Sequence, residues 1–254
     1  MLLVKLGGSV LTVKGEGHYR EPRPEAIHRL AAEMAPHAEG LAVIHGAGSY
    51  GHTLAKEHGL REGQVRPEQI PAATQVHRDV RILNGLVVEA LIQAHVPAVA
   101  VSTSEVVRFE DGRVVWFDKR PFRDHLRLGH VPVTFGDVVR DTKRSFTICS
   151  GDDLLVQLAL EFRPDLAVAV TAVDGVYDRK GGRLLETVDR AALSRIDFAS
   201  FGEGDATGTM REKLEKMLEV ARHAKRTLII GGAPGRLADA LAGKDVPGTR
   251  VLGG

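Results

Sequence analysis

The start of the chain repeats one pattern, a short apolar run that ends in a glycine-rich turn. Leu2–Val4 leads into Lys5-Leu6-Gly7-Gly8-Ser9, and Leu41–Ile44 leads into His45-Gly46-Ala47-Gly48-Ser49-Tyr50-Gly51-His52. Such runs are typical of buried strands in a parallel sheet. Small residues let several backbone N–H groups converge on one anion, and a following helix adds favourable partial charge. The two turns, which carry Lys5 and His52, therefore predict phosphate chemistry.

Neither turn matches a standard nucleotide fingerprint. The sequence contains no Gly-x4-Gly-Lys-Ser/Thr, so it has no Walker-type P-loop. The segment Gly46–Gly51 has the Gly-x-Gly-x-x-Gly spacing of dinucleotide-binding turns, but no clear acidic partner follows on the next strand. This spacing alone therefore does not indicate a dinucleotide site.

Apolar runs alternate with longer amphipathic stretches along the chain, which is typical of an α/β protein with a mostly parallel sheet. Strands are expected at Leu2–Leu6, Leu41–His45, Ala98–Ser102, Val131–Thr134, Leu166–Thr171 and Thr227–Ile230, and helices at Pro24–Ala38, Pro71–Ala94, Gly151–Phe162 and Met210–Ala224. The segment Val106–Asp118, with Asp111-Gly112 at its centre, predicts a β-hairpin.

Composition limits the classes of protein and of partner. The chain has 254 residues, of which 43% are apolar, and its formal net charge of +1 gives no global signal for nucleic-acid binding. The single cysteine, Cys149, excludes an internal disulfide, and we expect it to pack as a small hydrophobe. No apolar run approaches the ~18 residues that span a membrane, and the N-terminus lacks a signal-peptide pattern. We therefore expect a cytoplasmic protein without a membrane partner.

Three later segments carry polar residues at places where ligands bind in α/β proteins. Ser150-Gly151-Asp152-Asp153 opens a helix, where the acidic residues either cap the helix or, with Asp152, orient a catalytic lysine. Asp174-Gly175 follows a buried strand and is either a plain turn or part of a nucleotide pocket. Lys213 lies about one turn inside the helix that follows Asp205–Thr209, either as a surface lysine or within reach of a phosphate.

Together these segments resemble the amino acid kinase superfamily and, within it, the isopentenyl phosphate kinases. Lys-x-Gly-Gly-Ser from Lys5 and Asp-x-Thr-Gly-x-Met-x-x-Lys ending at Lys213 identify the superfamily. The narrower signal is His52 at the end of His-Gly-x-Gly-Ser-aromatic-Gly-His, strengthened by Val131–Val138 followed by Ser150–Asp153. The resemblance implies one domain over residues 1–254, a three-layer αβα sandwich around a mostly parallel sheet. Residues 1–164 would mainly bind the acceptor and residues 165–254 mainly the nucleotide.

Two positions depart from the family pattern. Ala47 stands at a usual glycine, and alanine keeps the backbone donor available if the turn needs only a negative φ. Thr209 replaces the second glycine of the late Thr-Gly-Gly motif, and a β-branched residue tolerates strained backbone poorly. If that position requires strain, Thr209 would weaken or reshape the nucleotide site while keeping its backbone donor.

The resemblance also implies the residues of the site, with ATP and Mg²⁺ as cofactors. The implied catalytic residues are Lys5, Lys14, His52 and Asp152. The lysines would hold the transferring and nucleotide phosphates, and Mg²⁺ would bridge nucleotide oxygens with no residue assigned as its ligand. Asp152 would orient Lys5 or Lys14, with direct contact to the metal as the alternative. The implied nucleotide-binding residues are Lys5, Gly7, Gly8, Ser9, Gly48, Asp174, Gly175, Thr209 and Lys213, and the implied acceptor-binding residues are Ala47, Gly48, His52 and Gly151.

The implied reaction is ATP-dependent phosphorylation of isopentenyl phosphate to isopentenyl diphosphate by a homodimeric transferase of isoprenoid biosynthesis, in the mevalonate pathway. A phosphate oxygen is already a competent nucleophile, so no general base is required. A fosfomycin kinase is the nearest alternative, an N-acetylamino-acid kinase fits His52 less well, and a non-catalytic nucleotide sensor is the alternative of another class. Ile82, Leu83, Leu86 and Val87, with Val101 and Ile148, either grip the tail of the acceptor or only pack the core.

Overall fold

A computed structural model describes residues 1–13, 15, 18–201 and 209–253 of the chain. Within these residues, the largest element is an eight-stranded sheet in which every strand pair is parallel except β11 with β12. Across the sheet the strands are β10 (Thr187–Val188), β12 (Gly248–Val251), β11 (Arg226–Gly231), β9 (Leu166–Thr171), β1 (Leu2–Leu6), β2 (Leu41–His45), β6 (Val131–Phe135) and β3 (Ala98–Ala100). The predicted mostly parallel sheet is therefore confirmed.

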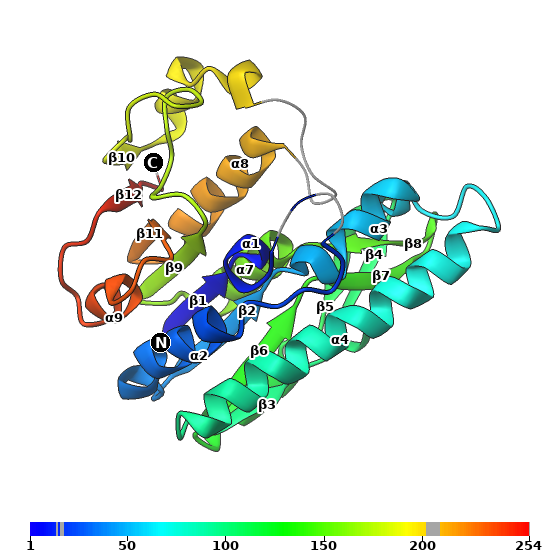
Figure 1. The fold of residues 1–254 in the computed structure, drawn as a ribbon, viewed down its shortest axis with the longest axis horizontal. Helices are drawn as coiled ribbons and strands as arrows, with labels where there is room; N and C mark the ends of the chain where they lie inside the picture. The colour runs from blue at the N-terminus through cyan, green and yellow to red at the C-terminus, as the bar shows by residue number, and fades with distance from the viewer. Residues whose placement is uncertain (14, 16–17, 202–208, 254) are drawn as a thin grey trace.

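Helices cover both faces of this sheet (Figure 1). The helices are α1 (Gly8–Leu11), α2 (Pro24–Met34), α3 (His52–Glu57), α4 (Gln69–Gln93), α5 (Thr103–Val106), α6 (Arg120–Arg127), α7 (Gly151–Phe162), α8 (Met210–Ala221) and α9 (Arg236–Leu241). Short 3-10 turns occur at η1 (Ala35–His37), η2 (Gly48–Tyr50), η3 (Leu60–Glu62), η4 (Arg190–Arg195) and η5 (Phe198–Phe201).

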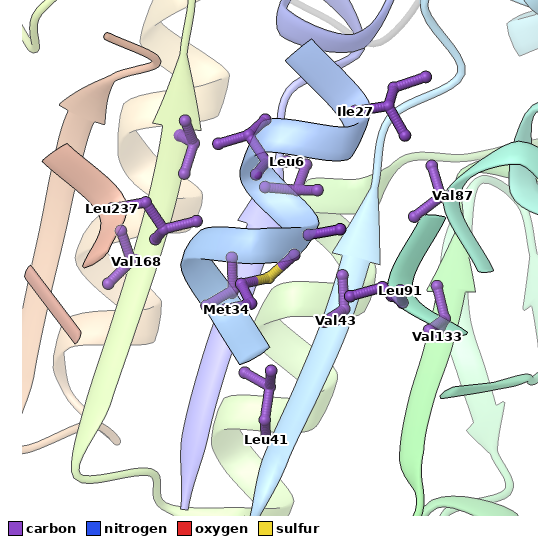
Figure 2. Packing of buried hydrophobic residues seen from close by; sticks show 14 of the residues in the cluster. Leu6, Ile27, Met34, Leu41, Val43, Val87, Leu91, Val133, Val168 and Leu237 are labelled. Atoms are coloured by element: carbon purple, nitrogen blue, oxygen red, sulfur yellow. The ribbon is translucent and has the colours of Figure 1, made fainter. Parts of the chain in front are cut away.

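The central strands are buried on both faces because side chains alternate between two hydrophobic layers. Leu41 and Val43 of β2 belong to the layer that also contains side chains of α2, α4 and α9, part of which Figure 2 shows, whereas Ala42 and Ile44 belong to the layer with side chains of α7 and α8. This arrangement explains why the strands read as continuous apolar runs in the sequence. It also confirms the predicted three-layer αβα sandwich.

Helix boundaries differ from the sequence-based expectation by a few residues. The helix expected at Pro24–Ala38 ends as α2 at Met34 and continues as η1, because Pro36 has no N–H to extend the hydrogen-bond ladder. Helix α4 begins at Gln69, two residues before Pro71, since proline is tolerated in a first turn whose N–H groups have no helical partner. Helix α8 ends at Ala221, before the expected Ala224, and β3 ends at Ala100, before the expected Ser102.

A second, four-stranded sheet contains β7, which begins two residues after the end of β6. Its order is β5 (Arg113–Phe117), β4 (Val107–Glu110), β7 (Asp137–Asp141) and β8 (Ser145–Cys149). The predicted hairpin around Asp111-Gly112 is confirmed as β4 and β5. The β7–β8 hairpin was not predicted, because its strands mix polar and apolar residues and its turn at Thr142–Arg144 contains no glycine.

No helix among the described residues is both long and apolar enough to cross a membrane.

Cys149 is fully buried at the end of β8, and burial raises the pKa of its thiol well above the ordinary value. The expectation that it packs as a small hydrophobe is confirmed.

Candidate active site

A cavity of about 340 Å³ lies at the carboxyl ends of β1, β2, β6 and β9. Ligands in open α/β sheets bind at this edge, where the strands give way to loops. The lining residues include Lys5, Gly7, Gly8, Ser9, Gly46, Ala47, His52, Gly136, Asp137, Gly151, Asp152, Thr171, Gly175 and Lys213. The two glycine turns, the start of α7 and the start of α8 therefore meet around one space.

The two glycine turns pack directly against each other. A Cβ atom at Gly8 would lie 2.6 Å from the Gly48 Cα, and one at Gly46 would lie 2.8 Å from the Gly8 nitrogen. Gly48 has a φ of +52°, which favours glycine. Thr12 joins the turns, because its Oγ1 donates to the Gly8 carbonyl at 2.8 Å and accepts the Ser49 N–H at 2.9 Å. Small residues are needed here for the close approach of two backbones.

Lys5 and Asp152 form a buried ion pair at the floor of the cavity. Lys5 Nζ lies 2.6 Å from Asp152 Oδ1, and their side chains are 13% and 7% exposed. Gly151 allows this approach, since a Cβ there would lie 3.3 Å from the Lys5 Cε and from the His45 carbonyl oxygen. Asp152 therefore contacts Lys5, one of the two lysines that it was expected to orient, across 147 residues of sequence.

Burial alone would raise the pKa of Asp152. The Lys5 ammonium lowers the pKa through its charge and its hydrogen bond, and the charges of Lys216 and Lys213 add to this. Together they outweigh the effect of burial, so the pKa of Asp152 is lowered. The carboxylate is therefore ionised at neutral pH, and the site keeps a fixed negative charge that holds an ammonium group in place.

Helix α7 begins with the capping box that Ser150 and Asp153 form. Ser150 Oγ accepts the Asp153 N–H at 3.1 Å, and Asp153 Oδ2 accepts the Ser150 N–H at 2.9 Å. Helix capping and orientation of a catalytic lysine by Asp152 were the alternatives for this segment in the sequence. In the structure each alternative applies to a different residue: Asp153 caps the helix, and Asp152 contacts Lys5.

The expected acceptor residues come from the second glycine turn and from α7. His52 is the first residue of α3 and lines the cavity with Ala47 and Gly151. Ala47 has a φ of −71°, so alanine fits this turn without strain, as expected. Gly48 lies next to Ala47 in the chain, and the position of its missing side chain faces Thr12.

The expected nucleotide residues that come from the second half of the chain follow β9 or begin α8. Gly175 and Lys213 line the cavity, whereas the Asp174 carboxylate accepts a hydrogen bond from the Arg236 guanidinium. Thr209 is extended, with a φ of −75°, and it caps α8 through the Glu212 N–H at 3.2 Å. The strain considered for Thr209 is therefore absent, because a helix N-cap needs ordinary extended backbone. Lys14 and the residues 205–208 lie outside the described residues.

One end of the cavity is apolar. Ala55 of α3, Val76 of α4 and Ile148 of β8 line it, next to a hydrophobic cluster that also contains Leu60 and Phe135. Of the six tail-gripping candidates, only Ile148 lines the cavity. Leu83, Val87 and Val101 are buried elsewhere in the core, and Ile82 and Leu86 are 38% and 39% exposed. The candidates on α4 lie too far toward the end of the helix to reach the cavity. Val76, nearer the start of α4, lines the cavity instead.

Asp137 lines the cavity and was not among the expected site residues. Its fully buried carboxylate accepts from Arg81 at 2.9 Å, contacts His77 Nδ1 at 3.1 Å and accepts the Val138 N–H at 2.7 Å. Its position just after β6 was the sequence feature that could have identified it as a site residue. Its partners on α4 are 56 and 60 residues away in the sequence, so no local pattern reveals them.

Comparisons with known proteins agree with this geometry. The sequence profile of the Amino acid kinase family matches residues 1–232. The chain is 35% identical over 246 residues to the isopentenyl phosphate kinase of Thermoplasma acidophilum, covering 94% of this chain and 95% of that relative. It is 34% identical over 266 aligned positions to the isopentenyl phosphate kinase of Methanothermobacter thermautotrophicus, covering 100% of this chain and 99% of the relative.

Solved structures give the same assignment. An X-ray structure of isopentenyl phosphate kinase matches with a TM-score of 0.84 at 31% identity, covering 99% of this chain and 100% of that chain. Aspartate kinase from Synechocystis, at 17% identity, a TM-score of 0.67 and with 40% of its chain covered, shares the fold alone. The chain therefore belongs to the amino acid kinase family and, within it, to the isopentenyl phosphate kinases.

Proposed function

We propose that this chain transfers the γ-phosphoryl group of ATP to isopentenyl phosphate, giving isopentenyl diphosphate and ADP. The observation that carries the proposal is one cavity that joins Lys5, Lys213 and the His52 imidazole to an apolar wall. An acceptor with a phosphate head and a short hydrocarbon tail requires both features. Two relatives that are 35% and 34% identical over almost the whole chain are named for this acceptor.

The reaction needs positioning and charge neutralisation more than covalent help. An oxygen of the acceptor phosphate forms a bond to the γ-phosphorus while the bond from that phosphorus to the β–γ bridging oxygen breaks. The electron pair leaves with ADP. No proton has to be removed from the nucleophile, so no general base is needed. The protein's task is to bring two anions together, and cationic side chains offset their repulsion.

Lys5, Lys14 and Lys213 take this role in the proposal, and Asp152 positions Lys5. The buried contact of 2.6 Å between Lys5 and Asp152 supports the positioning role, because it restricts a flexible side chain to one place. His52 would hold the acceptor phosphate with backbone donors near Ala47 and Gly151, which line the same part of the cavity.

In this proposal residues 1–164 mainly bind the acceptor and residues 165–254 mainly the nucleotide. The lining of the cavity supports the division, since His52 and Ala47 come from the first range and Gly175 and Lys213 from the second.

The described residues contain no group of three or more His, Cys, Asp or Glu suited to holding a metal. Mg²⁺ often binds through substrate phosphates and water, and here it would arrive on the nucleotide oxygens and neutralise part of their charge. The homodimer, the cytoplasmic location and the mevalonate pathway stay predictions.

Acceptor-dependent ADP release with Mg-ATP tests the proposal. Isopentenyl phosphate, fosfomycin and an N-acetylamino acid are compared at equal concentrations. We expect turnover of isopentenyl phosphate to dominate and His52→Ala to raise its KM and reduce kcat/KM by about 100-fold, as the loss of a charged contact implies. The KM for ATP should stay close to its wild-type value. Preferential turnover of fosfomycin or of the N-acetylamino acid would overturn the assigned acceptor, and ADP release independent of any acceptor would contradict the proposed transfer.

A further inference from the structure

His45, at the end of β2, is a titratable residue beside the cavity that the proposed mechanism does not use. It is 0% exposed, and its ring stacks on Phe135 with the centroids 5.5 Å apart and the planes 18° apart. Its Nδ1 lies 3.1 Å from the Gly46 carbonyl oxygen, and its Nε2 lies 3.1 Å from Asn84 Nδ2. Asn84 is itself buried on α4, so the contacts form inside the protein.

These contacts define the tautomer of the ring. A carbonyl oxygen only accepts hydrogen bonds, so Nδ1 carries the proton and donates to Gly46. Nε2 is then an acceptor, and the Asn84 amide donates to it. Burial lowers the pKa of His45 to about 4, which keeps the ring neutral at physiological pH.

The hydrogen bond to Gly46 sets the direction of the next peptide group. The described residues contain no cis peptide bond, and in a trans peptide the C=O and N–H groups point in opposite directions. Gly46 and Ala47 line the cavity, whereas the His45 ring packs behind the turn against Phe135 and Asn84. With the Gly46 carbonyl held toward the ring, the Ala47 N–H points away from the ring.

We infer that His45, held by Asn84, is a positioning residue that keeps the Ala47 N–H aimed at the phosphate of the acceptor. The inference deepens the proposed function and rests on it. Without the His45 hydrogen bond, the peptide could rotate and present the Gly46 carbonyl dipole to an anion, which would be repulsive. The residue acts through the backbone and does not touch the substrate.

Two substitutions of His45 test this role. His45→Phe keeps a planar ring against Phe135 but removes the donor, whereas His45→Asn places an amide donor near the position of Nδ1. We expect His45→Phe to raise the KM for isopentenyl phosphate about five- to tenfold, the effect of losing one neutral hydrogen bond. His45→Asn should stay within about threefold of wild type, and the KM for ATP should change less than about twofold in both. Equal acceptor KM values for wild type and His45→Phe would overturn the inference.

A measurement on the wild-type protein keeps the inference testable even if His45→Phe does not fold. ¹⁵N NMR of histidine-labelled protein should show a His45 ring protonated at Nδ1 and unprotonated at Nε2 between pH 6 and 8, as expected for a pKa of about 4. A ring protonated at Nε2 alone would overturn the inference. Wild-type turnover of isopentenyl phosphate is measured first, so failure of the proposed function is distinguished from failure of this role.

Discussion

Helices α7 and α8 both begin at the cavity with a capping box, but one start is buried and the other is exposed. At α7, Ser150 is 3% exposed and lies next to Asp152, which contacts Lys5. At α8, the Glu212 side chain is 41% exposed and binds Arg61 of η3 at 3.1 Å. The same capping box therefore occurs in a buried and in an exposed environment.

The difference shows how the two sides of the cavity are held. The start of α7 is fixed by the centre of the fold, where low solvent access strengthens electrostatic contacts and makes their loss costly. The start of α8 is fixed by contacts that water and salt screen. We therefore expect equivalent substitutions to have larger effects at α7 than at α8.

Asp152→Asn should produce the largest effect, because it leaves the Lys5 ammonium without its buried counter-charge. We expect kcat/KM to fall about 100-fold and the free energy of unfolding to fall by about 3 kcal/mol. Steady-state kinetics and urea unfolding measure the two effects. Asp165→Asn is the matched control, since Asp165 pairs with Lys225 and the N-terminus at the surface. If both variants lost activity equally, the importance of the buried pair would be disproved.

The same pair predicts a pH dependence of stability. The pKa of Asp152 is lowered in the folded protein, where the opposing effect of burial is outweighed by Lys5 and the neighbouring lysines. Its stabilising contribution is therefore fully present above the unfolded-state pKa of about 3.9 and is lost as the pH falls through the lower folded-state value. Urea unfolding at a series of pH values tests this. The free energy of unfolding of Asp152→Asn should lack the part of the decrease at low pH that protonation of Asp152 causes in the wild type.

A matched pair of cap substitutions should give intermediate effects. We expect Ser150→Ala to lower the free energy of unfolding by about 1–2 kcal/mol and Thr209→Ala by about 0.5–1 kcal/mol, because only the first leaves buried donors unsatisfied. Ser150→Ala should also reduce kcat, since it loosens the helix start that carries Asp152. Thermal unfolding and kinetics of both variants provide the test, and a larger loss at Thr209 would reverse the comparison.

Glu212→Gln should have the smallest effect. Glutamine keeps the capping box but loses the charge that pairs with Arg61, whose hydrogen bonds are the main reason for the lowered pKa of Glu212. After screening by solvent, we expect the free energy of unfolding to change by less than about 1 kcal/mol, and less in high salt. Urea unfolding at low and high salt measures this. A loss as large as that of Asp152→Asn would show that the exposed contact is as important as the buried one.

The sequence predicted the parts of the molecule that depend on local pattern. Apolar runs located the main strands because these strands are buried on both faces, and the glycine turns located the cavity. The β7–β8 hairpin was missed because its turn lacks a recognisable residue pair. The partners of His45 and Asp137 could not be predicted, since Asn84 and Arg81 come close only when α4 packs against the sheet.

The central claim is that a phosphate oxygen of the acceptor attacks ATP in this cavity. ³¹P NMR of a reaction containing the protein, Mg-ATP and isopentenyl phosphate tests it most directly. We expect the phosphomonoester resonance to be replaced by two coupled resonances of a diphosphate, in equal amount with ADP. Formation of ADP with inorganic phosphate and an unchanged phosphomonoester resonance would contradict it.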